Sequence, residues 1–246
     1  MSRYNGRNLP RATRVLLFCI DMNDTPACIG IIMDGNRRWA VARGLPKLEG
    51  HRQGAEVLRE TARNARDAGV KHLIVYAFST ENWQREQEEV GYLMDLLRDF
   101  FKNYLKDLSQ ENIRVRIVGQ KDRFDPDIQK IFEETEHAST NNTGLTLWVC
   151  LSYGSRAEIV AAAKAACARG QEITEDSLAA HLWTAGMPDP DIIIRTSGEK
   201  RLSNFLLWQA AYSELFFIDT MWPDFTKDKL GQVLAEFAAR ERRRGK

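Results

Sequence analysis

Short apolar runs alternate with longer amphipathic stretches along the chain from Pro26 onward. A continuous apolar run is typical of a strand that is buried on both faces, whereas apolar residues at helical spacing indicate a helix with one buried face. The apolar runs predict strands over Cys28–Met33, Val70–Phe78, Ile113–Val118, Leu145–Leu151, Asp191–Arg195 and Glu214–Asp219.

The amphipathic stretches between these runs predict the helices. Apolar residues recur at helical spacing across Val90–Leu108, and Gly69 stands where the preceding helix should end. Ser155 and Glu158 have the spacing of a capping box. We therefore expect helices over Gly50–Ala68, over Val90–Leu108, from Asp125-Pro126 onward, over Ile159–Ala168, and from Thr226 to the basic end of the chain.

Alternating strands and helices over about 220 residues predict an α/β protein with a largely parallel sheet. The 246 residues, of which 43% are hydrophobic and 28% charged, contain enough apolar material for one well-packed domain. We assign this domain to residues 26–246 and expect residues 1–25 to form a flexible N-terminal extension. Ligands of such folds bind beyond the carboxyl ends of the strands, so the residues at those positions are the first candidates for a site.

The composition excludes several classes of protein. A net charge of +1 argues against a protein that binds nucleic acid through bulk positive charge. The four cysteines are widely spaced and form no metal-binding pattern with histidine, so we expect no zinc and favour a reducing compartment. The apolar run Val15–Ile20 is too short to span a membrane or to serve as a secretory signal, and we therefore expect a cytoplasmic protein.

The segment Ile31–Ala40 (IIMDGNRRWA) carries the strongest chemical signal. An apolar run ends on Asp34, which can hold a divalent cation, and Gly35 allows the positive φ or close approach that a tight turn needs. The amides and arginines that follow can cradle a negatively charged group at a helix start. The segment predicts a phosphate site with a metal ligand, although an Asp-Gly pair after a strand is also an ordinary turn.

A second apolar strand ends on a cation, Arg195, and small hydroxyl residues, a glycine and Arg201 follow it. Arg195, Arg201 and Ser203 can together grip a second diphosphate, because arginine offers several coplanar donors. The alternative for Ser203 is a cap on a helix that follows it. Glu214 comes after a Trp- and Tyr-rich stretch that we expect to be helical, and it is either a hard oxygen ligand for Mg²⁺ or merely an acid at a strand edge.

Four predicted strand ends carry Asp34, Ser79, Tyr153 and Arg195, and in a parallel sheet these residues would share one edge. The polar stretch Ser79–Glu89 (STENWQREQEE) lies between a strand and a long helix. Its composition predicts a mobile loop that closes over a ligand.

The long helix offers Phe100, Phe101 and Tyr104 to line an apolar cavity, although such a stripe is more often ordinary core. His51, near the start of the preceding helix, can donate to a phosphate oxygen or be a plain surface residue. Two anion sites, two acids suited to a hard metal and an aromatic loop indicate chemistry on two phosphorylated substrates.

These motifs resemble those of the cis-prenyltransferases. The resemblance rests on long blocks that follow the family's order and cover roughly residues 26–245. The blocks are IIMDGNRRWA, Gly50-His51, YAFSTENW at Tyr76–Trp83, NTGLTL at Asn142–Leu147, IIIRTSGEKRLSNFLLWQ at Ile192–Gln209, and YSELFF with the WPDF that ends at Phe225. Cys28 departs from the pattern, because many members have His at that position.

The resemblance implies a homodimeric α/β fold around a six-stranded, mainly parallel sheet, with an apolar tunnel for the growing prenyl chain. It implies a Mg²⁺-dependent enzyme that adds isopentenyl diphosphate repeatedly to an allylic diphosphate such as farnesyl diphosphate, each new double bond being cis. The expected product is a cis-polyprenyl diphosphate, the undecaprenyl carrier of cell-wall assembly. Its lipid character implies peripheral contact with a membrane.

The resemblance also assigns roles to individual residues. It matches Asp34 to the acid that places Mg²⁺ on a diphosphate, Glu214 to a second metal ligand, and Asn82 to the group that abstracts a proton. The allylic-diphosphate site corresponds to Gly35, Asn36, Arg37, Arg38, Trp39, Lys47 and His51. The loop at the substrates corresponds to Ser79, Thr80, Glu81, Asn82, Trp83 and Arg85, and the isopentenyl-diphosphate site to Arg195, Arg201, Leu202 and Ser203.

Three other functions stay open at this point. A short-chain cis-prenyl diphosphate synthase would carry the same motifs. A non-catalytic partner subunit of the same fold should have lost part of the metal and arginine set, which this chain retains. An unrelated phosphohydrolase that uses Asp34 as a nucleophile would normally carry a second acid two residues later, where this chain has Asn36.

Overall fold

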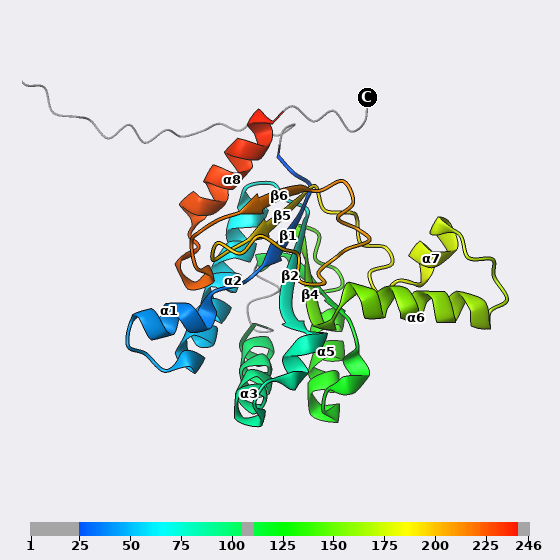
Figure 1. Ribbon diagram of the computed structural model, residues 1–246, viewed down its shortest axis with the longest axis horizontal. Helices are drawn as coiled ribbons and strands as arrows, with labels where there is room; N and C mark the ends of the chain where they lie inside the picture. Colours follow the sequence, from blue (N-terminus) through cyan, green and yellow to red (C-terminus); the bar gives the residue numbers. More distant parts are fainter. Residues whose placement is uncertain (1–24, 105–110, 241–246) are drawn as a thin grey trace, which may run out of the picture.

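The computed structural model describes residues 25–104 and 111–240. Figure 1 shows a central sheet with helices packed around it, and an arm formed by α6 (Ser155–Ala168) and α7 (Glu175–His181) that projects to one side. Apart from residue 25, the expected N-terminal extension lies outside the described residues. The same holds for the last residues of the helix expected over Val90–Leu108 and for the basic end after Arg240.

In the described part of the chain, six parallel strands form one sheet in the order β3-β4-β2-β1-β5-β6. They are β1 Cys28–Ile32, β2 His72–Ser79, β3 Ile113–Val118, β4 Leu145–Tyr153, β5 Ile192–Arg195 and β6 Glu214–Phe217. Strands β1 and β5 are buried along their whole length, as their continuous apolar sequences require. The predicted α/β class and the predicted strands are confirmed, with ends that shift by one or two residues.

Helices cover the two faces of the sheet unequally. The remaining helices are α1 Asn36–Ala42, α2 Lys47–Asp67, α3 Gln87–Tyr104, α5 Pro126–Ala138 and α8 Lys227–Ala239, with the short 3₁₀-helices η1 Thr80–Gln84, η2 Lys121–Arg123 and η3 Trp222–Asp224. One face packs against α2, α3, α5 and α8 in the main core. The other face packs against the chain between residues 183 and 210, including Phe205 and Leu206.

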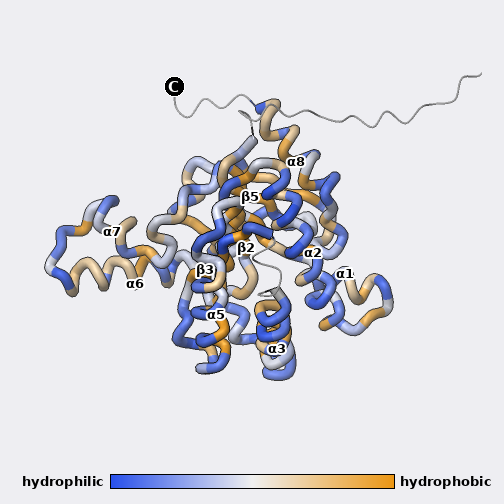
Figure 2. The backbone as a smooth tube through the Cα atoms, turned by 180° about the vertical axis from the view of Figure 1, so that it is seen from behind, coloured by the Kyte–Doolittle hydropathy of each residue, from blue (hydrophilic) through white to orange (hydrophobic). Residues whose placement is uncertain are grey.

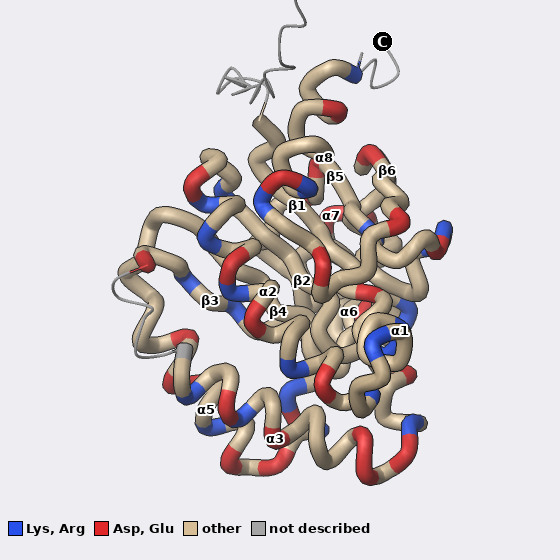
Figure 3. Tube along the Cα trace, turned by 90° about the vertical axis from the view of Figure 1, so that its left-hand side faces the viewer, with Lys and Arg blue, Asp and Glu red and all other residues tan. Residues whose placement is uncertain are grey.

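The distribution of polar and charged residues follows this layering. Figure 2 shows the hydrophobic strands at the centre of the molecule. In Figure 3 the charged residues lie mainly on helices and loops, whereas the strands are largely uncharged. An exception is β3, an edge strand with Arg114 and Arg116, whose apolar and charged residues alternate because one of its faces reaches solvent.

The predicted capping box at the start of α6 is wrong. Ser155 is the first residue of this helix rather than its N-cap, and its hydroxyl accepts the amide of Leu207. Glu158 is fully buried, and its carboxylate accepts hydrogen bonds from the side chains of Tyr153, Thr184 and Gln209. Contacts with distant residues therefore replace the expected local ones.

The helix expected between Ser203 and Glu214 is also wrong, because residues 196–213 form a series of turns. The hydroxyl of Ser203 caps no helix there and accepts a hydrogen bond from Arg195. Positive φ angles in this segment occur at Ser197, Gly198, Ser203, Asn204 and Leu206. Such angles are uncommon for residues other than glycine and concentrate at functional sites.

Candidate active site

A cavity of about 1070 Å³ opens at the carboxyl ends of β1, β2 and β5. Its walls come from these strand ends, from α1, α2 and α3, and from the segment 202–207. The apolar wall formed by α3 consists of Leu93, Leu96, Leu97, Phe100 and Phe101. The predicted apolar cavity along the long helix is therefore present, and the side chain of Tyr104 lies outside the described residues.

Asp34 follows β1, and its side chain lines this cavity. Its Oδ1 accepts a hydrogen bond from the amide of Gly35 at 2.7 Å and lies 3.5 Å from Nη2 of Arg38, while its Oδ2 accepts one from Arg195 at 2.7 Å. Burial alone would raise the pKa of Asp34, but the hydrogen bond and charge of Arg195, together with the amide of Gly35 and the charge of Arg38, lower this pKa below its usual value. The carboxylate is therefore charged at neutral pH.

The turn after β1 is fixed by contacts from the end of β5. The hydroxyl of Thr196 accepts a hydrogen bond from the backbone amide of Asp34 at 2.8 Å and donates one to the carbonyl oxygen of Asp34 at 2.6 Å. Gly35 has φ of 103°, and a Cβ at this position would lie 2.8 Å from Cβ of Ser197. Only glycine fits this turn, which leads directly into α1 at Asn36 as the sequence predicted.

Helix α1 brings Asn36, Arg37 and Arg38 to the cavity wall. It can do so because α2 approaches it closely at two glycines. A Cβ at Gly50 would lie 2.0 Å from the carbonyl oxygen of Asn36, and one at Gly54 would lie 2.4 Å from its Oδ1. Asn36 Oδ1 is buried and has no hydrogen-bond partner among the described residues.

Arg195 is nearly buried, with 4% of its side chain exposed. Besides Asp34, it donates to the carbonyl oxygen of Arg201 at 2.6 Å and to the hydroxyl of Ser203 at 2.7 Å. Its Nε is buried and finds no partner within the part of the chain that the structure describes. A buried guanidinium with a spare donor beside a cavity is suited to binding an anion.

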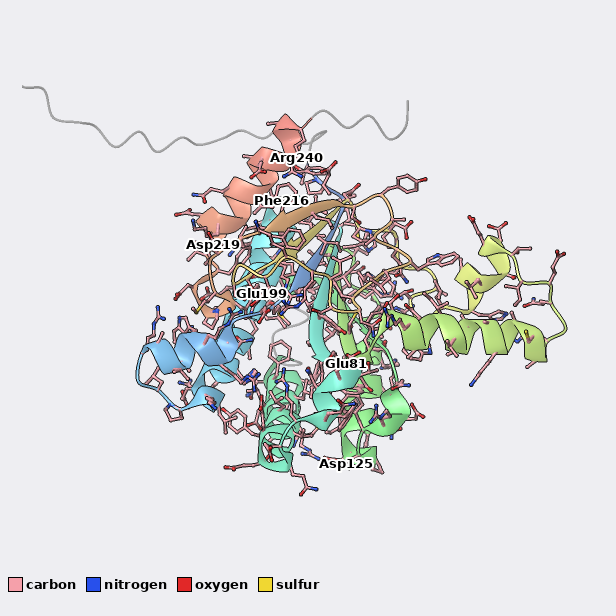
Figure 4. All side chains as sticks on the ribbon, viewed as in Figure 1. Glu81, Asp125, Glu199, Phe216, Asp219 and Arg240 are labelled. Atoms are coloured by element: carbon pink, nitrogen blue, oxygen red, sulfur yellow. The ribbon has the colours of Figure 1, made fainter. Side chains whose placement is uncertain are left out.

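Glu199, which is labelled in Figure 4, connects the two predicted anion sites through ion pairs. Its carboxylate lies 3.5 Å from Arg38 and 2.6 Å from Arg201. Arg38 also donates to the hydroxyl of Ser197 at 2.5 Å. Segments that are about 160 residues apart in the sequence therefore form one continuous polar mouth.

His51 lies in the first turns of α2 and lines the cavity. Its Nε2 is buried, lies 3.6 Å from Oε1 of Glu89, and makes no hydrogen bond with any described residue. Burial, followed by the positive charge of Arg85, lowers the pKa of His51 to about 4. The imidazole is therefore neutral at pH 7, and a neutral imidazole retains one N–H donor.

The predicted loop Ser79–Glu89 forms η1 and the first turn of α3. Asn82 Oδ1 accepts the amide of Ser79 at 3.0 Å, which closes a capping box between these residues. Glu81 accepts a hydrogen bond from Asn204 at 3.0 Å and thereby joins this segment to the one after β5. The cavity lining includes Ser79, Glu81, Asn82, Arg85, Leu202 and Ser203.

Some residues named from the sequence lie outside the cavity lining: Trp39, Lys47, Thr80, Trp83, Tyr153 and Arg201. Trp83 packs against Phe124 and donates to the hydroxyl of Ser152 at 2.9 Å. Trp39 donates to Asp224 at 2.8 Å. In this structure both indole N–H groups therefore donate to protein acceptors beside the site.

Tyr153 corrects the expectation that four strand ends share the site. It pairs in register with Ser79, but its side chain is fully buried in the cluster on the opposite face of the sheet. The pairing of β2 with β4 shifts register near Phe78, so these strand ends do not continue a regular ladder. Asp34, Ser79 and Arg195 do line the cavity together.

Glu214 lies at the other end of the sheet. It pairs with Ile192, and Ile192 pairs with Ile29, five residues before Asp34. At about 3.3 Å per residue, the two acids are about 16 Å apart along the strands. Glu214 accepts a hydrogen bond from Arg240 at 2.8 Å, so a single chain does not bring it to Asp34.

Several residues at the site were not singled out from the sequence. Tyr76, Arg156, Asn204 and Leu207 line the cavity, and Thr196 holds the backbone of Asp34. Arg156 follows a predicted strand end, which is the one signal that points to it. The other four lie in the blocks Tyr76–Trp83 and Ile192–Gln209 that carry the resemblance, but the turns and strand neighbours that bring them to the site are not visible in the sequence.

Comparisons with known proteins agree with this geometry. A family model described as "Putative undecaprenyl diphosphate synthase" matches residues 32–245. Isoprenyl transferase 2 of Bradyrhizobium diazoefficiens is 49% identical, covering 92% of each chain, and the isoprenyl transferase of Rhizobium meliloti is 47% identical, covering 90% of this chain and 93% of that one.

Two solved structures share the fold. Lavandulyl diphosphate synthase from Lavandula x intermedia, in complex with dimethylallyl diphosphate, is 34% identical with a TM-score of 0.87, covering 91% of this chain and 100% of that one. A probable undecaprenyl diphosphate synthase from Campylobacter jejuni is 30% identical with a TM-score of 0.78, covering 90% of this chain and 99% of that one.

The parallel sheet, the charged mouth and the apolar cavity thus define an enzyme that transfers prenyl groups. The chain belongs to the undecaprenyl diphosphate synthase family, whose curated relatives are isoprenyl transferases. Within residues 25–104 and 111–240, no helix is long and apolar enough to cross a membrane.

Proposed function

We propose that this prenyltransferase adds isopentenyl diphosphate repeatedly to an allylic diphosphate such as farnesyl diphosphate, and that its product is the undecaprenyl carrier. The observation that carries the proposal is a mouth with Asp34, Arg38 and Arg195 that opens into an apolar cavity of about 1070 Å³. Small-molecule pockets usually measure about 300–1,000 Å³. The mouth suits diphosphates, and the large cavity suits a growing hydrocarbon.

The residues at the mouth fit Mg²⁺. Asp34 is charged and partly exposed, and the described residues contain no cluster of three or more potential metal ligands. Mg²⁺ is commonly held by one or two carboxylates together with substrate phosphate oxygens and water. Asp34 would hold the ion, which when bound neutralises charge on a diphosphate.

Different side chains would stabilise the leaving diphosphate and orient isopentenyl diphosphate. Negative charge grows on the departing diphosphate as the allylic C–O bond breaks, and Arg37, Arg38 and a neutral His51, which line the cavity, would stabilise it. Arg195 and Ser203 would orient isopentenyl diphosphate so that its double bond faces the allylic carbon. Each CH₂ of the growing chain that is buried in the cavity contributes about 0.8 kcal/mol of favourable binding free energy.

Asn82 is our candidate for accepting the proton that leaves after the new C–C bond forms. Its Oδ1 accepts one hydrogen bond, from the amide of Ser79, and a carbonyl oxygen has a second lone pair. The side chain also lines the cavity. Asn82→Ala should therefore lower turnover while leaving the affinity for farnesyl diphosphate within twofold or so.

Incubation with Mg²⁺, farnesyl diphosphate and labelled isopentenyl diphosphate tests the proposal directly. We expect labelled polyprenol of C55 length after hydrolysis of the product, and no incorporation when Mg²⁺ is removed by a chelator. The absence of any extractable labelled prenol would refute the activity. It would favour a non-catalytic partner subunit instead.

A short-chain synthase is the second candidate, favoured by the likeness to lavandulyl diphosphate synthase. The same assay separates the two, because chromatography resolves products by length. Condensation that stops after one or two additions, or that starts better from dimethylallyl diphosphate than from farnesyl diphosphate, would identify a short-chain enzyme.

We further propose a cytoplasmic homodimer that touches the membrane only through its lipid product. The cysteines among the described residues are free, which suits a reducing compartment. Tyr212, two residues before the edge strand β6, and Leu215, within it, are exposed where a second copy could bury them. Sedimentation at micromolar concentration should give twice the mass of the 28.2 kDa chain.

A further inference from the structure

Glu89, in the first turn of α3, contacts three basic groups from three other segments. Its Oε2 accepts a hydrogen bond from Arg37 of α1 at 3.3 Å, and its Oε1 accepts one from Arg85, just after η1, at 2.8 Å. The same Oε1 lies 3.6 Å from Nε2 of His51 on α2. Arg37, Arg85 and His51 line the cavity, whereas Glu89 stands behind them with 15% of its side chain exposed.

The positive charges of Arg37 and Arg85 disfavour protonation of their basic neighbours in this cluster. After burial, the positive charge of Arg37 helps to lower the pKa of Arg85, and the charge of Arg85 helps to lower the pKa of His51. Glu89 acts in the opposite direction on both pKa values. Removing its carboxylate would leave two cations and a buried imidazole next to each other, and the flexible arginines would move apart.

We propose that Glu89 is a positioning residue for the diphosphate site at the mouth of the cavity. Its carboxylate holds Arg37, Arg85 and His51 together, so an incoming diphosphate meets donors that are already assembled. Ligands bind more tightly when the ordering of the site precedes binding. The inference rests on the proposed function for the identity of the ligand, and Glu89 itself touches no substrate.

Glu89→Gln removes the charge and keeps the shape, and Glu88→Gln makes the same change at the exposed neighbouring residue of α3. Calorimetric titration with farnesyl diphosphate and Mg²⁺, without isopentenyl diphosphate, measures binding in the absence of turnover. We expect about tenfold weaker binding for Glu89→Gln, equivalent to about 1.4 kcal/mol, and wild-type binding for Glu88→Gln. Equal affinities in the two variants would overturn the inference.

Steady-state kinetics and NMR distinguish positioning from a general loss of structure. In Glu89→Gln the KM for farnesyl diphosphate should rise while kcat changes less than threefold or so, and Glu89→Asp should restore part of the affinity. The pKa of His51, followed by its ring resonances, should fall because the nearby carboxylate is gone. An unchanged His51 pKa, or a Glu89→Asp variant as weak as Glu89→Gln, would contradict the proposal.

A double-mutant cycle completes the test. If Glu89 acts through the arginines, the loss of affinity in Arg37→Met/Glu89→Gln is smaller than the sum of the single losses, whereas additive losses would refute the role. A wild-type protein that neither binds farnesyl diphosphate nor incorporates isopentenyl diphosphate would refute the proposed function and this inference together. An active wild type with no difference between Glu89→Gln and Glu88→Gln would refute the inference alone.

Discussion

At the carboxyl end of the sheet Asp34 and Arg195 form an ion pair at 2.7 Å, and at the amino end Glu214 and Arg240 form one at 2.8 Å. The first pair borders the cavity, and 4% of the Arg195 side chain is exposed. In the second pair, 33% of the Arg240 side chain is exposed, and its guanidinium lies over the ring of Phe216 (Figure 4). The same chemical pair thus occurs in two very different surroundings.

The surroundings decide what each pair can do. At the carboxyl end, buried polar atoms of Asn36, His51 and Arg195 have no hydrogen-bond partner among the described residues. At the amino end, Asp191 accepts the amides of Ala27 and Cys28 at 2.8 and 3.0 Å and joins β1 to the start of β5. Spare donors and acceptors beside a cavity indicate a binding site, whereas a carboxylate that accepts backbone amides from a neighbouring strand joins the chain to itself.

The largest expected effect is on turnover at the carboxyl end. Asp34→Asn keeps the size of the side chain and removes the charge that would hold Mg²⁺, so kcat should fall by about 10²–10³-fold. Labelled isopentenyl diphosphate measures the rate, and circular dichroism checks that the variant is folded. A folded Asp34→Asn enzyme with near wild-type turnover would remove this acid from the mechanism.

The pH dependence of the unfolding free energy should also show the effect of buried His51 at the carboxyl end of the sheet. The pKa of His51 is about 4 in the folded protein and about 6.5 in the unfolded chain, so the unfolded state takes up the proton first as the pH falls. Relative to His51→Gln, the wild type should lose roughly 3 kcal/mol of unfolding free energy between pH 7 and pH 4.

Urea denaturation at several pH values measures this difference. The two proteins should differ most in slope between pH 6.5 and pH 4, the interval bounded by the unfolded and folded pKa values. Parallel curves over that interval would mean that His51 is not buried as a neutral group.

At the amino end, Asp191→Ala should affect stability rather than chemistry. It leaves the amides of Ala27 and Cys28 without their acceptor, which should cost about 2 kcal/mol. Turnover per folded molecule should stay within about twofold of the wild type, because the cavity lies at the other end of the sheet. A large loss of kcat in a stable Asp191→Ala protein would show that the two ends are coupled.

The smallest expected effect belongs to Glu214→Gln. Its pair with Arg240 is partly exposed, so the loss of stability should stay below about 1 kcal/mol. Turnover then decides its role: a wild-type rate assigns Glu214 to the pair alone. A large loss of turnover at unchanged stability would assign it to a site completed by a second copy of the chain.

The sequence predicted much of this molecule from local patterns. Apolar runs located the strands, and the turn at Asp34-Gly35 was predicted because a strand, an acid and a glycine stand next to each other. Predictions failed where distant contacts prevail over local ones. Glu158 turns away from the helix start into a buried network, and the segment around Ser203 forms turns against the sheet.

Glu89 and Glu214 illustrate the same limit at the level of the site. In the sequence Glu89 is one acid in the run Glu86–Glu89, and only its contacts with three other segments distinguish it. The resemblance matched Glu214 to a second metal ligand beside Asp34, and the alternative was an acid at a strand edge. The register of β6 places it at the opposite end of the sheet instead.

The sequence by itself determined the strands, most of the helices and their chemistry, because side-chain periodicity, turn residues and charge are properties of neighbouring residues. The tertiary structure decided which strands lie side by side and which of their ends face the cavity. The bond between Arg195 and Asp34 joins residues 161 positions apart, and it forms only because β5 pairs with β1. Strand order and burial arise from such long-range contacts, which no local pattern encodes.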